Sequence, residues 1–418
     1  MSSSNASAAG NTGIALATPV ILPSMSDSGF SHLGLRQKLV LGADALDRVG
    51  TEATAQGMAR PLLICSARAR VSVLFHRVEA SFGSVRPTMW SEVPVHAPLS
   101  TTLRAAAFAR AAGCDGIVAF GGGSVSDLAK GVALALAEGD TLEPFVVRRE
   151  HGQIVGQTSM TPKLPIIAVP TTLSGAEVTP GFSLTRDDAY KLLFRDPQLA
   201  ARVVLLDPAV LSDLPQALLA GTLANALAHG CEALYSLVRT PISSLFARDG
   251  LRELMHGADL WFAAAHDGQP IDAGLRRQGS TALLLGGYLV ATAIVNARTA
   301  LHHATCHKLA PVLGASHGEI NALILPHALA FNLPACAQAL EDIASAIGCA
   351  TASVESVIER LNCHARRSAL RQRLREFGVE RDCLADVAQR VYAEPGLAFN
   401  PRPISSAAQI EQMLDGAW

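Results

Sequence analysis

Short apolar runs recur along the first half of the chain, separated by stretches of helix-forming composition. The runs are PLLIC at 61–65, GIVAF at 116–120, PIIAV at 165–169 and VVLL at 203–206. Short runs without polar alternation are typical of strands that are buried on both faces of a sheet. Residues 99–112, between the first two runs, have the composition of a helix. This rhythm predicts a parallel sheet covered by helices.

The pattern changes after Asp207, where Pro208 and Pro215 interrupt the chain and long helical periodicity follows. With 418 residues, the chain is longer than one hydrophobic core usually serves. We therefore expect an α/β domain with a Rossmann-like parallel sheet over 35–207 and an all-α domain over 208–418. Residues 1–34 are rich in Ser, Ala and Gly and do not resemble a signal peptide, so we expect a flexible tail.

Composition and charge exclude several classes of protein. The chain is 49% hydrophobic and 17% charged, which indicates a well-buried globular protein. Its net charge of -2 gives no general reason to bind nucleic acid or a membrane surface. The uncharged stretch at 279–297 contains Gly, Ser, Thr and Asn, which favours a buried core helix over a membrane span. Eight cysteines without a C-x-x-C pair argue against a zinc knuckle or a disulfide framework and favour a cytoplasmic location.

A GGGS turn at 121–124 follows directly on the second apolar run and opens a predicted helix at 125–136, with Asp127 and Lys130 near its start. Glycines let the backbone approach a phosphate closely, and the N-terminal end of a helix favours an anion. The turn therefore suits a dinucleotide pyrophosphate. A strand-to-helix corner also needs glycine for purely structural reasons, and the G-x-G-x-x-G fingerprint is absent from this turn.

A second turn, rich in hydroxyl groups, supports the interpretation as a nucleotide site. The sequence PTTLSG at 170–175 follows directly on the third apolar run. Ligands gather at the carboxyl ends of parallel strands, where both turns are expected. Two such turns favour a nucleotide over a structural corner.

Histidines are spaced so that several of them converge. Asn225 and His229 are four residues apart and share one helical face, and His303 and His307 do the same, while His317 lies beyond a break at Gly314. Imidazoles bind divalent metals or transfer protons near neutral pH. A single histidine on a helix is more often a hydrogen-bonded core or surface residue. We prefer that structural role for His302 and His327.

These segments together resemble the iron-containing alcohol dehydrogenase superfamily. The resemblance is carried by GGGSVSDLAK, PTTLSGAEVTP and HATCHKLAPVLGASH and runs from about residue 38 to the end of the chain. Within the superfamily, NALAHGCEALYS, LHHATCH and NPRPI look most like the maleylacetate reductases. The resemblance implies a dehydroquinate synthase-like fold: a dinucleotide-binding domain, a helical catalytic domain and an active site between them, in a homodimer.

The resemblance also implies roles for individual residues. His307 matches the histidine near the nicotinamide, and His229 and His303 join it as catalytic candidates. The residues expected to bind NADH or NADPH are Gly121, Gly122, Gly123, Ser124, Asp127, Thr171, Thr172, Ser174 and Lys191.

The metal-ligand positions of the family fall on Asn225, His229, His303 and His317. Metal-dependent members have an aspartate where this chain has Asn225, and maleylacetate reductases look similar to this chain in having asparagine. A neutral amide is a weaker ligand for a hard divalent ion. We therefore expect no tightly bound iron or zinc.

The strand at 61–65 is followed by CSARAR, without the acidic residue that often holds the ribose of NAD. Arg68 and Arg70 suit the 2'-phosphate of NADPH, although exposed arginines are usually solvated surface. A dicarboxylate substrate needs cationic partners, for which Lys191, Arg195, Arg239 and Arg248 are candidates. For Arg239 and Arg248 the alternative is a salt bridge or a helix-end contact.

The resemblance implies hydride transfer to the alkene of maleylacetate, giving 3-oxoadipate, with histidines as hydrogen-bond or proton donors. Three alternatives stay open: a metal-dependent alcohol dehydrogenase or aldehyde reductase, a lyase or synthase like the dehydroquinate synthases, and a non-catalytic ligand-binding protein.

Overall fold

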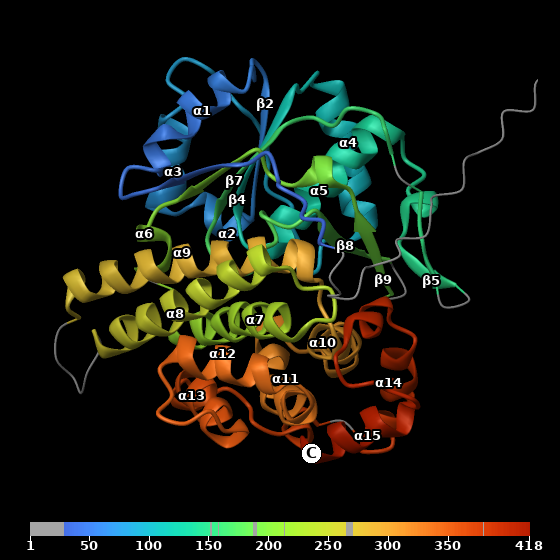
Figure 1. Cartoon of the computed structure of the whole chain (residues 1–418). Helices are drawn as coiled ribbons and strands as arrows, with labels where there is room; N and C mark the ends of the chain where they lie inside the picture. The colour runs from blue at the N-terminus through green and yellow to red at the C-terminus, as the bar shows by residue number, and fades with distance from the viewer. Residues whose placement is uncertain are drawn as a thin grey trace, which may run out of the picture.

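In the computed structural model a sheet domain lies above a helical domain (Figure 1). The structure describes residues 29–150, 153–157, 159–186, 190–212, 214–264, 271–378 and 380–418. Most of the predicted tail, as far as residue 28, lies outside the described residues. Its last part contacts the helical domain: the backbone N–H of Leu33 donates to Asn296 Oδ1 at 2.6 Å, and Asn296 Nδ2 donates back to the Leu33 carbonyl at 3.1 Å.

The main sheet is parallel throughout, which confirms the predicted fold class. In spatial order its strands are β1 (Lys38–Leu41), β10 (Val203–Leu206), β7 (Ile166–Pro170), β4 (Gly116–Gly121), β2 (Pro61–Cys65) and β3 (Thr88–Trp90). The four predicted apolar runs are β2, β4, β7 and β10, and every residue of these strands is buried. Burial on both faces explains why they lack polar alternation.

The helices of the sheet domain cover the two faces of the main sheet, and two hairpins lie outside it. Its helices are α1 (Val49–Ala55), α2 (Ala67–Arg70), α3 (Val73–Ala80), α4 (Leu99–Ala111) and α5 (Gly123–Glu138). The hairpins are formed by β5 (Arg148–Glu150) with β6 (Gln153–Val155) and by β8 (Gly181–Thr185) with β9 (Lys191–Arg195).

The second half of the described chain is helical, as expected. Its helices are α6 (Ala209–Ser212), α7 (Gln216–Tyr235), α8 (Pro241–Ala263), α9 (Ala273–Ala297), α10 (Leu301–Leu313), α11 (His317–Asn332), α12 (Ala337–Ile347), α13 (Val354–Arg367), α14 (Cys383–Tyr392) and α15 (Ala407–Gly416). Short 3₁₀ helices occupy Leu46–Arg48, Glu143–Phe145, Pro197–Leu199, Leu333–Ala335, Leu374–Phe377 and Pro395–Phe399.

Helix α9 is long and apolar enough to cross a membrane, but 67% of its most apolar window is buried inside the protein. Its glycines allow a close approach to α8. A Cβ atom on Gly279 would lie 2.7 Å from the carbonyl oxygen of Gly257, and one on Gly286 would lie 2.8 Å from that of Gly250. Small residues at both crossings explain why the uncharged stretch of this helix, residues 279–297, forms part of the core.

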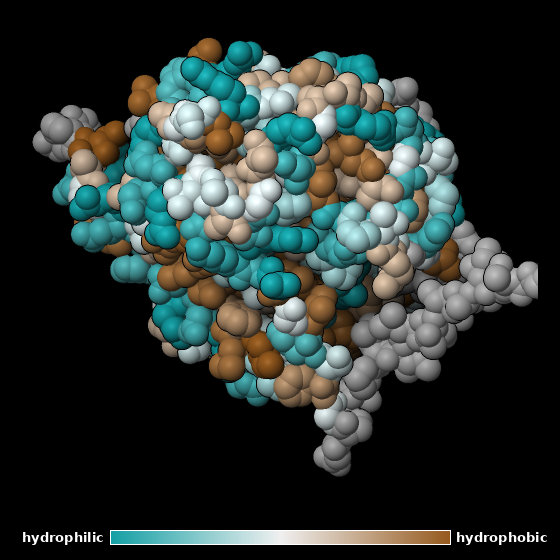
Figure 2. All heavy atoms as spheres, turned by 90° about the horizontal axis from the view of Figure 1, so that it is seen from above, coloured by the Kyte–Doolittle hydropathy of each residue, from teal (hydrophilic) through white to brown (hydrophobic). Residues whose placement is uncertain are grey.

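The face of the sheet domain that Figure 2 shows does not carry one dominant chemical character. Seen from above the sheet domain, hydrophilic and hydrophobic residues are interspersed across the face (Figure 2). This agrees with the small net charge and leaves anion recognition to local sites.

Candidate active site

The two predicted coenzyme turns lie side by side because β4 and β7 are neighbours in the sheet, with Gly121 in register with Pro170. Gly121 has a φ of +156°, and a Cβ atom there would come within 2.5 Å of Val125, so the strand can end here only with glycine. A Cβ atom on Gly122 would lie 3.1 Å from Thr172. The two turns are therefore in direct contact.

The polar groups at these turns suit an anion. No side chain caps the N-terminus of α5 at Gly122. The hydroxyl of Thr172 is buried and has no hydrogen-bond partner among the described residues. Free N–H groups at a helix N-terminus beside an unpartnered hydroxyl fit the pyrophosphate of a dinucleotide.

Asp127 and Lys130, on the first turns of α5, bond to other parts of the sheet domain. The Asp127 carboxylate accepts hydrogen bonds from the backbone N–H and the hydroxyl of Ser183, at 3.3 and 3.4 Å. The Lys130 ammonium is buried and donates to the carbonyls of Thr179 at 2.6 Å and Gly181 at 2.9 Å, and also to that of Ala176. Lys130 thus fixes the segment that follows the hydroxyl-rich turn.

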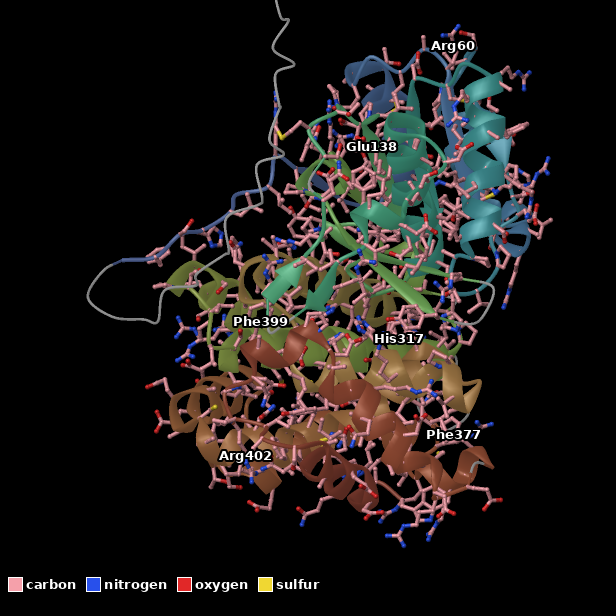
Figure 3. All side chains as sticks on the ribbon, turned by 90° about the vertical axis from the view of Figure 1, so that its right-hand side faces the viewer. Arg60, Glu138, His317, Phe377, Phe399 and Arg402 are labelled. Carbon is pink, nitrogen blue, oxygen red and sulfur yellow. The ribbon has the colours of Figure 1, made fainter. Side chains whose placement is uncertain are left out.

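Three helices bring the predicted histidines together. His229 lies on α7, His303 and His307 on α10, and His317 at the start of α11. The rings of His229 and His303 stack with centroids 4.5 Å apart, and those of His307 and His317 stack at 5.9 Å. The centroids of His303 and His307 are 6.3 Å apart. Figure 3 places His317 between the sheet domain and the helices below it.

The histidine cluster joins the hydroxyl-rich turn. Asn225 Nδ2 donates to the carbonyl of Ser174 at 3.2 Å. Gly175 has a φ of +67°, and a Cβ atom there would lie 2.7 Å from Ala291 and 3.7 Å from His229. The predicted coenzyme residues and the predicted catalytic residues therefore form one continuous site.

Burial keeps most of these imidazoles neutral. Desolvation lowers the pKa of His303 to about 3 and those of His229 and His317 well below their usual value, and neighbouring histidines act in the same direction. A neutral imidazole has one N–H donor and one free acceptor. His229 and His303 are buried, whereas His307 and His317 are partly exposed, and a quarter of the His307 side chain is accessible.

Glu232 was not predicted from the sequence, although it is the one acidic residue of α7. It is completely buried, and its Oε1 accepts backbone N–H groups of Ala300 and His302 at 3.0 Å. Its Oε2 lies 2.5 Å from His303 Nδ1. Glu232 therefore fixes both the start of α10 and the ring of His303. An acid within an apolar helix is the signal that would have found it.

The hydrogen bonds around Asn225 show which way its side-chain amide points, that is, where its oxygen and its nitrogen lie. Asn321 Nδ2 donates to Asn225 Oδ1 at 3.3 Å, and the same oxygen lies 3.3 Å from His303 Nε2. When His303 Nδ1–H donates to the Glu232 carboxylate, the lone pair of Nε2 faces Asn225 Oδ1. A proton or a cation between these two acceptors would stabilise them, so the donor atoms fit a metal ion.

The expectation that no metal binds is not supported. Among the described residues, Glu232, His302 and His303 have ligand-type atoms within 4.8 Å of one another. The Glu232 oxygens are occupied by the bonds given above, and His302 Nε2 bonds to the carbonyl of Asn321 at 3.1 Å. These bonds assign Glu232 and His302 to orienting His303, which agrees with the structural role expected for His302.

His307 has its own carboxylate neighbour, which the sequence did not reveal. Glu394 Oε2 lies 4.0 Å from His307 Nδ1, and Glu394 also pairs with Lys308. Burial alone would raise the pKa of Glu394, but these two partners hold it below its usual value. The second carboxylate of the site is therefore ionised beside a partly exposed histidine, His307.

The other predicted cations have different positions. The positive charge of Lys191, at the start of β9, acts on His317 and helps to lower the pKa of that imidazole. Arg239 donates to the carbonyl of Ser236, and Arg248 pairs with Asp342 at 3.4 Å, which are the structural alternatives expected for them. Three more residues lie away from the histidine cluster: Arg68 and Arg70 are on the exposed helix α2, while His327 is half-buried on α11 near Arg373.

Comparison with known proteins defines the class of protein. Residues 36–208 match the family model "Iron-containing alcohol dehydrogenase", and residues 219–418 match the C-terminal model of the same family. The chain belongs to the iron-containing alcohol dehydrogenase family and is an oxidoreductase.

Within that family the relatives include a particular reductase. A maleylacetate reductase of Sphingobium indicum is 30% identical over 93% of this chain and 97% of its own length. The crystal structure of maleylacetate reductase from Agrobacterium tumefaciens is 28% identical, with a TM-score of 0.75, and covers 94% of this chain and 98% of that one. An iron-containing alcohol dehydrogenase of Corynebacterium glutamicum is similar too, at 27% identity and a TM-score of 0.76, covering 94% and 97%.

Proposed function

We propose that this chain uses NADH or NADPH to reduce maleylacetate, or a substituted maleylacetate, to 3-oxoadipate. The observation that carries the proposal is the likeness to a maleylacetate reductase over 93% of the chain. Maleylacetate reductases look similar to this chain in having an asparagine at this position, and here Asn225 is a neutral amide beside three imidazoles. A substrate with two carboxylates also suits a site whose histidines have Lys191 and Lys308 near them.

In this reaction hydride leaves the nicotinamide for one alkene carbon, and a proton is added at the neighbouring carbon. The oxidised coenzyme and the saturated oxoacid are the products. The alkene is conjugated with a ketone, so hydride addition places negative charge on the ketone oxygen. Neutral N–H donors in a buried cluster stabilise that charge. His307 is positioned to supply the proton because it is partly exposed and lies beside Glu394.

Asn225, His229, His303 and His317 are the residues that would hold a divalent ion. Such an ion, when bound, supplies Lewis acidity to a substrate oxygen. The chain's own residues orient this donor set, since Glu232 fixes His303 and Ser174 fixes Asn225. Metal dependence is therefore a property to be measured together with the substrate.

The deciding experiment follows coenzyme oxidation with maleylacetate, using chelator-treated protein and protein supplied with iron or zinc. The proposal expects stoichiometric oxidation of NADH or NADPH and formation of 3-oxoadipate. Activity with aldehydes but not with maleylacetate would instead identify an alcohol dehydrogenase, the function that the relative from Corynebacterium favours. Turnover without net coenzyme consumption would identify a lyase or synthase.

Coenzyme preference is measured in the same assay. Arg68 and Arg70 follow β2, the strand next to the glycine turn, and no acidic residue lies between them and the strand. We propose that NADPH is accepted because these arginines suit a 2'-phosphate. A lower KM for NADPH in the wild type than in an Arg68→Ala, Arg70→Ala variant would support this.

A further inference from the structure

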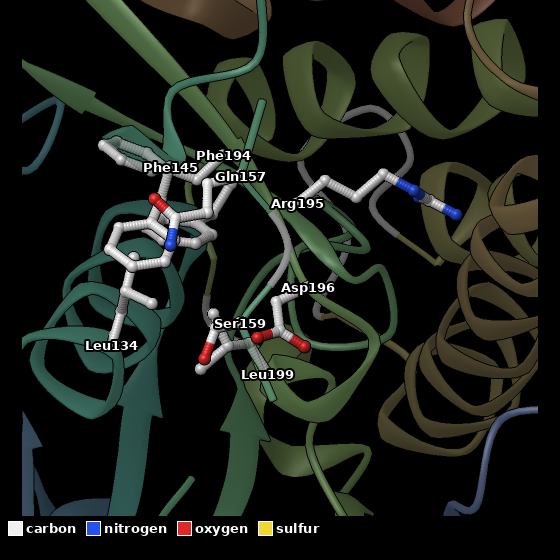
Figure 4. A pocket seen from close by; sticks show the side chains of 9 residues that line it. Leu134, Phe145, Gln157, Ser159, Phe194, Arg195, Asp196 and Leu199 are labelled. Atoms are coloured by element: carbon white, nitrogen blue, oxygen red, sulfur yellow. The ribbon is translucent and has the colours of Figure 1, made fainter. Parts of the chain in front are cut away.

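Two polar clusters lie outside the candidate active site and differ in how easily they can be reached. In the sheet domain, the buried Lys163 Nζ lies 2.7 Å from Glu138 Oε1 and 3.7 Å from Asp196 Oδ2. It also donates to the hydroxyl of Ser159. Figure 4 shows Ser159, Asp196 and the predicted substrate cation Arg195 at a cavity of about 10 Å³ beside this cluster. A cavity of that size holds at most one water molecule, so we assign this cluster to the fold.

The second cluster joins α8 to α13, where the carboxylate of Asp259 on α8 binds two basic side chains of α13. Arg360 donates to both carboxylate oxygens, from Nη1 to Oδ1 at 3.0 Å and from Nη2 to Oδ2 at 2.5 Å. His364 Nε2 lies 3.0 Å from the same Oδ1. The ring of His364 also stacks on Phe262, with centroids 4.5 Å apart. The positions of both basic groups are therefore fixed.

Cys363 places its sulfur beside these basic groups. Arg360 and Cys363 are three residues apart on α13, and Arg360 Nη1 donates to Cys363 Sγ at 3.6 Å. The thiol is half-buried, so it can be reached from solvent. Burial opposes its ionisation, but contacts with His364 and Arg360 outweigh burial and lower the pKa of Cys363. Burial instead raises the pKa of two other half-buried thiols, Cys336 and Cys383.

One ring nitrogen of the cluster is poorly satisfied. His364 is 3% exposed, and its Nδ1 is buried with no nitrogen or oxygen partner among the described residues. Since Nε2 faces Asp259, Nδ1 is the ring nitrogen that interacts with the neighbouring Cys363 sulfur. As an imidazolium, the form that a nearby carboxylate favours, the ring carries a proton on both nitrogens. A buried donor costs free energy unless it meets an acceptor, and an oxygen atom attached to the sulfur would supply that acceptor.

We propose that Cys363 is a modification site, at which hydrogen peroxide oxidises the thiolate to a sulfenic acid. The sulfur attacks one peroxide oxygen, so an S–O bond forms as the O–O bond breaks and the sulfur loses two electrons to the peroxide. The other oxygen leaves as hydroxide and takes a proton from the His364 imidazolium to become water. Arg360 stabilises the thiolate, which is the form that reacts. Asp259 is a positioning residue, because it fixes both basic groups.

The test treats the full chain with a limiting amount of hydrogen peroxide, traps sulfenic acid with dimedone and follows the labelling of each cysteine by mass spectrometry. Cys363 should be labelled roughly tenfold faster than Cys336 and Cys383, because a larger fraction of it is thiolate. A rate for Cys363 equal to or below those of the other two thiols would overturn the proposal.

Variants separate the charge of Arg360 from its contribution to the fold. Arg360→Gln should slow the labelling of Cys363 roughly tenfold, whereas Arg360→Lys should keep most of the rate because it keeps the positive charge. Arg366→Gln, on the same helix and exposed beside Glu359, is the matched control and should be labelled like the wild type. Melting temperatures show which variants are folded. Unchanged labelling in a folded Arg360→Gln variant would contradict the role of the arginine, and the comparison among the three wild-type thiols needs no variant.

The pH dependence of alkylation gives a second readout that does not involve peroxide. Iodoacetamide reacts with thiolates, so its rate at each cysteine follows the fraction of that residue that is ionised. Cys363 should reach its half-maximal rate at a lower pH than Cys336 and Cys383, because Arg360 and His364 lie beside its sulfur. A midpoint at the same pH as those two thiols, or at a higher one, would show that the basic groups do not activate Cys363 and would overturn the assignment.

Discussion

The proposed coenzyme end of the site is built from consecutive residues at two neighbouring strand ends, whereas the histidine end is assembled from three helices. At the coenzyme end the backbone supplies the binding groups, and glycines make room for them. At the histidine end side chains supply the polar groups, and Glu232 and Glu394 lie against His303 and His307. A turn therefore depends on local conformation, while the cluster depends on long-range contacts.

The two ends also differ in how they treat charge. The N-terminus of α5 presents uncapped N–H groups to an incoming anion. The cluster keeps most of its imidazoles neutral by burial, and its two carboxylates, Glu232 and Glu394, are each bonded to a histidine or a lysine. If this contrast is correct, variants at the histidine end should change turnover, and variants at the coenzyme end should change coenzyme affinity.

The largest effect is expected from Glu232→Gln. Glutamine keeps an oxygen for the backbone N–H groups at the start of α10 but presents an amide to His303 Nδ1, so the ring must change tautomer. Loss of the correct tautomer should lower kcat roughly a thousandfold, as in other oriented histidines. Steady-state kinetics should show this drop with little change in coenzyme affinity.

Thermal melting provides the control for that variant. Glu232→Gln should melt near the wild-type temperature, as should Glu359→Gln, whose side chain forms an exposed pair with Arg366. A large fall in the melting temperature of Glu232→Gln would mean that Glu232 mainly stabilises the fold. Unchanged kcat would show that His303 does not need its carboxylate partner.

His307→Ala is expected to have the next largest effect. Removal of a proton donor should lower kcat roughly a hundredfold, while the dissociation constant of the coenzyme stays the same. Stopped-flow single turnovers would separate the chemical step from binding. His76→Ala, at an exposed histidine that pairs with Glu79, is the control. Equal losses in turnover and coenzyme affinity would contradict a catalytic role.

The contrast between the two ends explains what the sequence could predict. The strand at 61–65 coincides with β2, and the turns at β4 and β7 meet, because strand burial and glycine turns leave contiguous patterns. The convergence of histidines was predictable from their helical spacing and from the family resemblance. The partners were not: Glu232 meets His303 across 71 residues, and no local pattern encodes such a contact.

Other features were missed for the same physical reason. The β8–β9 hairpin lies outside the main sheet, so only one of its faces is buried and no continuous apolar run marks it. The positive φ of Arg298 could not be predicted from the sequence either, because arginine is not a residue type that favours a positive φ. Positions that depart from local preference are often functional, and they are the hardest to predict.

A smaller effect, confined to the coenzyme end, is expected from Gly122→Ala. The added Cβ atom would lie 3.1 Å from Thr172 and would displace its hydroxyl from the turn. We expect the dissociation constants of NADH and NADPH to rise roughly tenfold, because one hydrogen bond to a charged group is lost. Fluorescence titration measures this. Gly34→Ala, where nothing lies within 4 Å of the added atom, should bind normally. A fall in kcat alone would contradict the separation of the two ends.

The smallest effect concerns a buried histidine outside the site, whose environment contrasts with that of the cluster. Burial alone would lower the pKa of His364, but hydrogen bonds to Asp259 and Cys363 raise it above its usual 6.5. The pKa of Asp259 is lowered to about 2: burial opposes this, but His364 and Arg360 outweigh it. Asp259 is about half exposed, so the pair contributes under ~1 kcal/mol to stability.

The pH dependence follows from the signs of these two shifts. The contribution of His364 is fully present below pH 6.5 and is lost as the pH rises through its higher folded pKa. The contribution of Asp259 is present above its unfolded pKa near 3.8 and is lost as the pH falls through about 2. Urea unfolding should therefore show the largest stability difference between wild type and His364→Gln from about pH 4 to 6.5, shrinking toward pH 9. A difference that stays constant or grows with pH would show that His364 is neutral in the folded protein, like the buried histidines of the cluster. In that case burial, rather than contact with a carboxylate, would decide the charge of His364.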